Sequence, residues 1–300
     1  MRPVVVLGDT LLDVDVDGRT DRMCPDAPVP VLDVTAEHAR PGGAGLAAAM
    51  LAASDQSVVL VTALAEDADG VRLRTLLEPM VPLVAGPARG GTPVKLRIRA
   101  GGSSLLRVDR GEGHPTAGFG AAVDAGLAAA LARAAAVLVS DYGRGVAADP
   151  AVRAALTAAV AAGVPVVWDP HPRGPAPVPD VTVATPNLGE ARAALDAHPD
   201  LPEPELAGGL VRHWNCRAVA VTVGERGAVL ACRDGAGLSV PARRVTDGDP
   251  CGAGDAFAGR VAALLAQGAA VDAAVRGAVS AAQAFVAAGG AAALRFARAS

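Results

Sequence analysis

The chain has few aromatic residues and almost no lysine. Among its 300 residues, phenylalanine, tryptophan and tyrosine make up 2%, Tyr142 is the one tyrosine, and Lys95 is the one lysine among 27 lysine and arginine residues. Heavy use of arginine and alanine indicates GC-rich coding, so alanine is weak evidence for helices here. The formal net charge of -4 gives no reason to expect binding to nucleic acid or to an anionic membrane.

Cysteine is also scarce. Cys24, Cys216, Cys232 and Cys251 form no C-x-x-C pair and no cluster with histidine at zinc spacing. This usage favours a reduced, cytoplasmic protein. Charges and glycines interrupt the apolar segments before they reach the length of a membrane span, and the apolar start at residues 4–7 is too short for a signal peptide.

Short β-branched runs alternate with longer alanine-rich segments, which predicts an α/β fold with a mostly parallel sheet covered on both faces by helices. In such sheets, ligands bind beyond the C-terminal ends of the strands. We expect strands at 4–7, 58–62, 137–140, 164–168, 181–184 and 219–223. We expect helices at 45–53, 67–78, 119–135, 150–162, 188–197, 203–214, 255–266 and 271–288.

Two charged segments, residues 13–35 and 92–110, break the alternation. They have period-two patterns in places, as in Lys95-Leu96-Arg97-Ile98-Arg99. This predicts antiparallel strands outside the main sheet, forming a small β-lid over its C-terminal edge. The proline-rich stretch 170–179 predicts a rigid loop rather than a linker, so we expect residues 1–300 to form a single domain.

The segment Asp249-Pro250-Cys251-Gly252-Ala253-Gly254-Asp255 leads into a predicted helix. Glycines at a helix entry let a ligand approach the backbone, and the first N–H groups of the helix attract anions. Asp255 would repel an anion, but it can take a proton from a hydroxyl that attacks a phosphate. The alternative is an ordinary helix start whose acid complements the helix dipole.

Other polar motifs also follow predicted strands. Asp9 and Asp13 can accept hydrogen bonds from sugar hydroxyls, or they are solvated turn acids, an interpretation that suits Asp9 better. Gly42 and Gly43 can let a ligand touch the main chain, or they form an ordinary loop. Beside Asp141, Arg144 can hold a phosphate with two hydrogen bonds, or the segment is a surface turn.

Two further motifs have the same ambiguity. Asn187 and Glu190 share a helix face and suit hydrated magnesium, although an N-cap with a first-turn acid explains them equally well. The turn from Thr222 through Gly224 to Gly227 can clear space for a nucleotide, or it is a hairpin turn.

Together and in this order, these motifs resemble the PfkB, or ribokinase-like, family of sugar kinases, and within it the heptose 7-phosphate kinases. The resemblance runs over nearly the whole chain and implies a three-layer α/β/α fold with a small antiparallel β-lid. The residues that carry it are Gly8–Asp13, Cys24–Val31, Pro41–Ala44, Lys95–Arg97, Ser140–Tyr142, Asp169–Pro170, Thr185–Leu188 and Gly252–Asp255.

The resemblance implies ATP-dependent phosphorylation of a heptose 7-phosphate at its anomeric hydroxyl, with Mg²⁺, in a homodimer that pairs through the lid. Asp255 matches the family's base, and Gly252, Ala253 and Gly254 match its anion hole. The other matches are sugar contacts at Asp13, Gly42 and Gly43; the magnesium–phosphate element at Asn187 and Glu190; the nucleotide edge at Thr222, Gly224 and Gly227; and a monovalent-cation (K⁺) site near Asp249. Charge alone suggests Arg107 and Arg144, with Asp141 nearby, for the sugar and its existing phosphate.

The chain departs from the family pattern at four positions. Leu46 stands where the family has a sugar-binding asparagine, and His171 where heptose kinases have a lysine. Cys251 stands where relatives have a threonine, and Ser280 roughly where they place an asparagine near the adenine. A kinase for another sugar, sugar phosphate or nucleoside is therefore the first alternative, and a sugar- or nucleotide-binding regulator without catalysis is the second. A dehydrogenase lacks support because no G-x-G-x-x-G follows the first strand.

Overall fold

The computed structural model describes residues 2–101, 103–243, 245 and 248–294, and its main sheet has ten strands in the order β14-β13-β12-β11-β10-β9-β1-β4-β5-β8. The seven strands from β12 to β5 in this order are parallel, while β13, β14 and β8 are antiparallel to their neighbours. The strands are β1 (Val4–Gly8), β4 (Val58–Leu64), β5 (Leu83–Arg89), β8 (His114–Pro115), β9 (Ala136–Ser140), β10 (Val166–Asp169), β11 (Val183–Ala184), β12 (Ala218–Thr222), β13 (Gly227–Cys232) and β14 (Gly237–Pro241).

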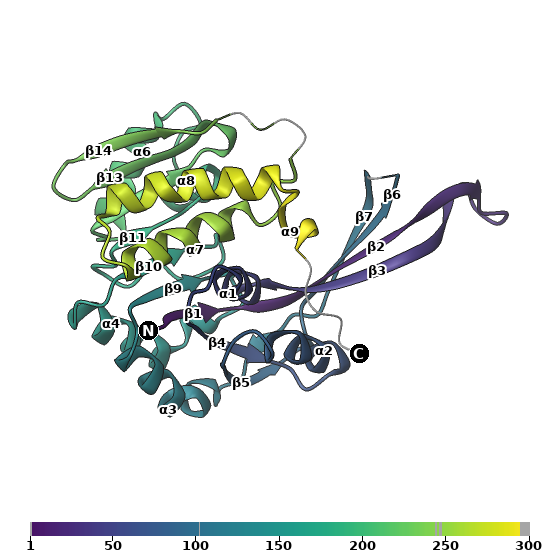
Figure 1. The fold of residues 1–300 in the computed structure, drawn as a ribbon, viewed down its shortest axis with the longest axis horizontal. Coiled ribbons are helices and arrows are strands. Elements are labelled where there is room, and N and C mark those ends of the chain that lie inside the picture. Colours follow the sequence, from purple (N-terminus) through teal and green to yellow (C-terminus); the bar gives the residue numbers. More distant parts are fainter. Residues whose placement is uncertain (1, 102, 244, 246–247, 295–300) are drawn as a thin grey trace.

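Helices cover both faces of this sheet (Figure 1). They are α1 (Ala44–Ala53), α2 (Ala68–Leu77), α3 (Phe119–Ala132), α4 (Pro150–Ala161), α5 (Leu188–Leu195), α6 (Glu203–His213), α7 (Ala253–Ala266), α8 (Val271–Ala287) and the short α9 (Gly290–Ala293). Side chains alternate across β1, so Val4 and Val6 pack with α1 and α7, whereas Val5 and Leu7 pack with α3 and α4. The predicted α/β fold, with a mostly parallel sheet between two helical layers, is confirmed.

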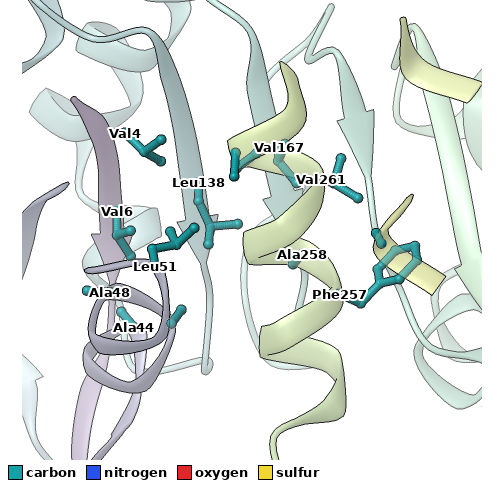
Figure 2. Close-up of a cluster of buried hydrophobic side chains, with 14 of the residues drawn as sticks. Val4, Val6, Ala44, Ala48, Leu51, Leu138, Val167, Phe257, Ala258 and Val261 are labelled. Atoms are coloured by element: carbon teal, nitrogen blue, oxygen red, sulfur yellow. The ribbon is translucent and has the colours of Figure 1, made fainter. Parts of the chain in front are cut away.

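The first of these two cores places the two helices that matter most for the site. Figure 2 shows α1 and α7 side by side over the sheet, with Ala48 and Leu51 from α1 and Ala258 and Val261 from α7 pointing toward the strand residues. Alanine at these positions lets both helices lie close to the sheet, so their N-termini are fixed relative to each other.

A second sheet forms the lid, with strand order β3-β2-β6-β7. Its strands are β2 (Thr10–Met23), β3 (Pro30–Gly43), β6 (Val94–Ala100) and β7 (Ser103–Arg110). Figure 1 shows β2 and β3 extending well away from the body of the molecule. The expectation that the lid strands are all antiparallel is wrong for one pair, because β2 and β6 are parallel. Between them the chain returns to the main sheet, where it forms β4 and β5, before it enters the lid again.

The lid begins closer to the body than the segment 13–35 suggests. β2 starts at Thr10, with the single residue Asp9 between it and the end of β1, and β3 runs to Gly43, directly before α1. The root of the lid is therefore continuous with β1 and α1. In the described part of the chain, the helices are all too short or too polar to cross a membrane.

Candidate active site

The start of α7 has the geometry of an anion site. Gly252 caps the helix with φ 82° and ψ 5°, a left-handed conformation that favours glycine. Ala253 donates its N–H to the carbonyl of Pro250 at 3.0 Å. The N–H groups of Gly254 and Asp255, in the first turn, have no acceptor within the helix and carry the partial positive charge of the helix end.

Asp255 lies in this first turn and is 6% exposed. Burial raises the pKa of its carboxyl to about 7, the hydrogen bond from Tyr142 opposes that rise, and the nearby Asp13 carboxylate adds to it. The Tyr142 hydroxyl donates to both carboxylate oxygens at 2.9 Å. Asp255 is therefore a buried carboxylate that can exchange a proton near neutral pH, which is what a general base requires.

A cavity of about 220 Å³ lies beside Asp255 and is bordered mainly by polar groups. Its walls include Asp141, Tyr142, Asp169, His171, Asn187, Glu190, Gly252, Ala253 and Gly254. Burial raises the pKa of Asp169 well above its ordinary value, and the charges of Asp255 and Glu190 add to this effect. Carboxyl groups from three separate elements thus converge on the helix end that attracts anions.

Asn187 and Glu190 form a capping box at the start of α5. Asn187 Oδ1 accepts from the Glu190 N–H at 3.0 Å, and Glu190 Oε2 accepts from the Asn187 N–H at 2.8 Å. The purely structural interpretation therefore holds, yet both side chains also line the cavity. Burial raises the pKa of Glu190. The capping bonds fix these oxygens in place, so one pair of residues can both begin the helix and face a ligand.

These oxygen donors fit a magnesium ion that is held largely by phosphates and water. Mg²⁺ prefers oxygen ligands and keeps several waters, so it needs only one or two carboxylates from the protein. Asp169 and Glu190 supply such carboxylates beside the N–H groups of α7. Among the described residues, no group of three or more histidine, cysteine, aspartate or glutamate side chains converges as a preformed metal site.

A second, more apolar pocket of about 310 Å³ lies between the β12–β13 connection and α8. The predicted nucleotide edge lines it: Thr222, Gly224 and Gly227. Both cavities are bordered by Thr222, Pro250, Ala253 and Gly254. The two cavities therefore meet at the N-terminus of α7. This arrangement suits a nucleotide whose base lies in the apolar pocket and whose phosphates reach the polar cavity.

Ser280 does not line this pocket. Its side chain is exposed, and its hydroxyl donates to the Arg276 carbonyl at 3.3 Å. The pocket-facing residues of α8 are Val279, Ala282, Gln283 and Val286. They follow the helical spacing of three and four residues, and that spacing turns position 280 away.

The root of the lid brings Asp13 toward the same region. Asp13 is buried and accepts a hydrogen bond from Arg97 Nη1 at 2.7 Å. A Cβ atom on Gly42 would lie 2.5 Å from Asp13 Oδ2, and one on Gly43, where φ is 61°, would lie 2.4 Å from the Asp9 carbonyl oxygen. Both glycines therefore have a steric reason to be glycine beside these acids.

Asp9 is not the solvated turn acid that the sequence suggested, because it is 3% exposed. Its carboxylate accepts from the backbone N–H groups of Tyr142 at 3.1 Å, Arg144 at 2.9 Å and Val146 at 3.0 Å. Asp9 thus shapes the loop after β9 that presents Tyr142 to Asp255.

Asp141 is 3% exposed, and burial raises the pKa of its carboxyl to about 7. Its Oδ1 accepts from the Gly143 N–H at 2.8 Å, and its buried Oδ2 has no hydrogen-bond partner in the structure. Asp141 lines the cavity. The unused Oδ2 is itself buried and lies against Gly174.

The two arginines chosen on charge do not line either cavity. Arg107 is exposed and pairs with Asp109 through bonds of 2.8 and 2.6 Å. Arg144 donates to the carbonyl oxygens of Gly111 and Glu112. Asp249 Oδ1 accepts from the Cys251 N–H at 2.9 Å, so it orders the turn before α7.

Sequence reasoning assigned no role to Tyr142 or Asp169, which both face the cavity. Tyr142 carried one usable signal, since it is the one tyrosine of the chain and directly follows Asp141 at a strand end. Asp169 ends β10 immediately before Pro170, and a proline after a strand marks the turn at the sheet edge where ligands bind.

Comparison with known proteins adds a family to this geometry. A family model described as "pfkB family carbohydrate kinase" matches residues 90–295. The chain is 48% identical over 303 residues to the "Bifunctional protein HldE" of Streptomyces coelicolor, covering 97% of this chain and 62% of that protein. It is 37% identical over 275 residues to the protein of that name from Caulobacter vibrioides, covering 89% of this chain and 56% of that protein. The chain thus spans about three fifths of the length of these curated relatives.

Solved structures share the fold at low identity. Phosphofructokinase-2 of Escherichia coli, in its tetrameric inhibited form, has a TM-score of 0.73 at 20% identity and covers 95% of this chain and 94% of that chain. Ribokinase of Thermotoga maritima has a TM-score of 0.72 at 18% identity and covers 99% of this chain and 97% of that chain. The fold is therefore ribokinase-like.

Proposed function

Because the chain belongs to the pfkB family of carbohydrate kinases, we propose that it transfers the γ-phosphoryl group of ATP to the anomeric hydroxyl of a heptose 7-phosphate. The product is then a heptose 1,7-bisphosphate. The observation that carries this proposal is Asp255: a buried carboxylate in the first turn of a helix whose N-terminus separates an acidic cavity from an apolar pocket. Identity of 48% to a bifunctional HldE protein supports the heptose class, together with the heptose-like segment Cys24–Val31.

The residues divide the reaction between them. Asp255 accepts the proton of the attacking hydroxyl, and the start of α7 at Gly252, Ala253 and Gly254, where the N–H of Gly254 has no acceptor within the helix, faces the phosphoryl group that moves. The apolar pocket beyond Thr222 and Gly224 takes the adenine. When bound, Mg²⁺ neutralises charge on the ATP phosphates, and Asn187, Glu190 and Asp169 would hold its waters. Asp13, Gly42 and Gly43 contact the sugar under the lid.

A kinase for a different sugar is the second candidate, and Leu46 favours it. Leu46 is 3% exposed and packs at the start of α7, where a Cβ on Gly252 would lie 3.2 Å from its Cδ2. A leucine there offers no hydrogen bond to a sugar hydroxyl. His171 also lines the cavity, and burial and the nearby Arg173 lower its pKa, so it is uncharged where a lysine would be cationic.

A substrate panel with coupled detection of ADP tests the proposal. Heptose 7-phosphate should give a kcat/KM at least about tenfold above those of hexose phosphates, ribose and nucleosides, since discrimination by missing or added contacts reaches this size. A higher value for another acceptor would replace heptose with that acceptor. Binding of ATP without turnover of any acceptor would favour a non-catalytic regulator.

The assembly and ion requirements are part of the same proposal. Exposed apolar side chains on the lid, Val34 at 60%, Leu105 at 48% and Leu106 at 56%, support a homodimer that pairs through the lids. The free cysteines favour the cytoplasm as its location. Phosphofructokinase-2 of Escherichia coli has a solved complex with potassium, which supports a K⁺ site near Asp249. Sedimentation of the Leu106→Glu variant and assays in KCl against tetramethylammonium chloride test these two points: a persistent dimer or equal rates would refute them.

A further inference from the structure

Tyr142 makes an unusually direct contact with the base. Its hydroxyl lies 2.9 Å from Asp255 Oδ1 and 2.9 Å from Asp255 Oδ2, so one proton is shared between both oxygens of the carboxylate. Burial raises the pKa of the Tyr142 phenol well above its ordinary value, and the charge of Asp255 adds to the rise. The phenol therefore keeps its proton at every pH at which Asp255 changes charge, and Tyr142 can act on the base only as a donor.

Two other elements help to fix Tyr142 in this place. The Asp9 carboxylate, after β1, accepts the Tyr142 backbone N–H at 3.1 Å. From the lid strand β6, Lys95 Nζ lies 5.2 Å from the ring centroid, which is a cation–π distance. A tyrosine held at its backbone and over its ring can present its hydroxyl to the carboxylate in a single orientation.

We propose that Tyr142 is the positioning residue of the base, an inference that rests on the proposed function. The Tyr142 hydroxyl orients the buried carboxylate of Asp255 and favours its ionised form. When the acceptor hydroxyl arrives, it takes one carboxylate oxygen and Tyr142 keeps the other. As the new O–P bond forms and the bond from the γ-phosphorus to ADP breaks, the proton of the sugar hydroxyl passes to Asp255. Tyr142 retains its own proton throughout.

The charged groups around Asp255 do not by themselves favour its ionised form. Asp13 from β2 raises the pKa of Asp255, and Lys95 from β6 lowers it more weakly than the Tyr142 hydrogen bond does. Asp169, at the end of β10, also interacts with the charge of Asp255. With two acids nearby and a single lysine, a neutral donor at 2.9 Å is the strongest influence that keeps the buried carboxylate ionised.

The composition of the chain makes a two-directional test possible. Because the chain has one tyrosine, growth on 3-fluorotyrosine changes Tyr142 alone. A fluorinated phenol is a stronger donor, whereas Tyr142→Phe removes the donor and keeps the ring. We expect the pKa of Asp255, followed by NMR of ¹³Cγ-labelled aspartate in the full chain, to rise by about 1 in Tyr142→Phe and to fall in the fluorinated protein. Asp255→Asn assigns the signal.

Asp141 provides an internal control in the same spectra. Its carboxyl also titrates at about 7, yet no hydrogen bond joins it to the Tyr142 hydroxyl. Its pKa, assigned with Asp141→Asn, should move much less than that of Asp255. An unchanged pKa of Asp255, or shifts in the same direction in both proteins, overturns the proposal. If Tyr142→Phe fails to fold, the pKa of Asp255 in the fluorinated protein still tests the proposal.

Kinetics separate this inference from the proposed function. In an active kinase, the acid limb of kcat/KM against pH should move in the direction of the NMR pKa, while KM for ATP stays within about twofold. Opposite NMR shifts with no turnover of any sugar would leave Tyr142 as the positioning residue and refute the kinase assignment. Turnover of heptose 7-phosphate with an unchanged pKa of Asp255 would support the kinase assignment and refute the positioning role of Tyr142.

Discussion

Leu46 packs against Gly252, so that the first turn of α1 and the cap of α7 meet at an apolar contact. A Cβ on Gly252 would lie 3.2 Å from Leu46 Cδ2, and Phe285 and Ala291 complete the contact. Position 46 therefore offers no hydrogen-bonding group beside the cap of α7. A sugar hydroxyl placed against Leu46 would lose its contacts with water without gaining a partner, which costs binding free energy.

The Leu46→Asn variant tests whether the side chain at position 46 selects the sugar. We expect the kcat/KM ratio between two acceptors of the panel to change by about tenfold, because a buried amide favours acceptors with a hydroxyl at that place. Burying the amide should also lower the free energy of unfolding by about 2–5 kcal/mol. Leu46→Met is the matched control, since it conserves volume and should preserve the ratio. Equal ratios in the two variants would show that position 46 does not select the acceptor.

Replacing the base by its amide should nearly abolish turnover. Asp255→Asn keeps the size of the side chain and an oxygen that can accept from Tyr142, but it cannot take a proton. We expect kcat to fall by about a hundredfold or more, while the affinity for ATP by calorimetry and the circular dichroism spectrum stay unchanged. Asp124→Asn, at an exposed acid on α3 that lines neither cavity, is the control. Turnover within about tenfold of the parent would remove Asp255 from the role of base.

The rate should rise with pH through neutrality. The base works in its ionised form, and burial raises the pKa of Asp255 to about 7. Below that pH the protonated fraction grows, so kcat/KM should fall about tenfold for each pH unit on the acid side. Because Asp141 also titrates at about 7, the limb must persist in Asp141→Asn. A profile that is flat down to pH 5.5 would contradict the raised pKa of the base.

The apolar pocket can be filled without touching the acidic cavity. Ala282 on α8 lines this pocket, and Ser280, two residues earlier, faces away from it. Ala282→Phe should raise KM for ATP by about tenfold or more and leave KM for the sugar within about twofold, because the ring takes space in a pocket of about 310 Å³. Ser280→Phe should change neither value. Equal effects of the two variants, in initial-rate assays, would place the adenine elsewhere.

Local patterns in the sequence predicted much of the fold. The runs at Val4–Leu7 and Ala136–Val139 are continuously apolar because both faces of those strands are buried, and such runs are visible without a structure. The glycine–acid pattern at Gly252–Asp255 identified the helix end that both cavities share. β13 and β14 were not among the expected strands, although the hairpin-turn alternative at Gly224–Gly227 implies a strand antiparallel to β12; β13 is that strand, and β14 pairs antiparallel to it.

Long-range hydrogen bonds were beyond the reach of these patterns. Asp9 accepts from backbone groups 133 to 137 residues away, and Tyr142 donates to an acid 113 residues away. Nothing in the local sequence distinguishes such an acid from a solvated one. The arginines chosen on charge fail for a related reason: Arg107 is already paired with Asp109, two residues along the same strand. A charge in a sequence does not show which partner it has.

The buried Asp141 should make the stability of the protein depend on pH in a predictable direction. In the unfolded chain its carboxyl loses its proton near its ordinary pKa of 3.8, whereas the folded protein holds that proton until about pH 7. The stabilisation from this proton is complete below about pH 4 and is lost as the pH rises through 7. Between pH 5 and 8, the parent should therefore lose about 2–3 kcal/mol of unfolding free energy relative to Asp141→Asn, which does not titrate.

Urea unfolding of both proteins at pH 5 and pH 8 measures this difference directly. Comparing the change with pH, rather than stability at one pH, removes the constant cost of placing an amide at the buried Oδ2 position, which has no hydrogen-bond partner in the structure. Asp26→Asn should follow the parent at both pH values, because its side chain is exposed. If Asp141→Asn also parallels the parent, the Asp141 carboxyl is already ionised at pH 5 in the folded protein.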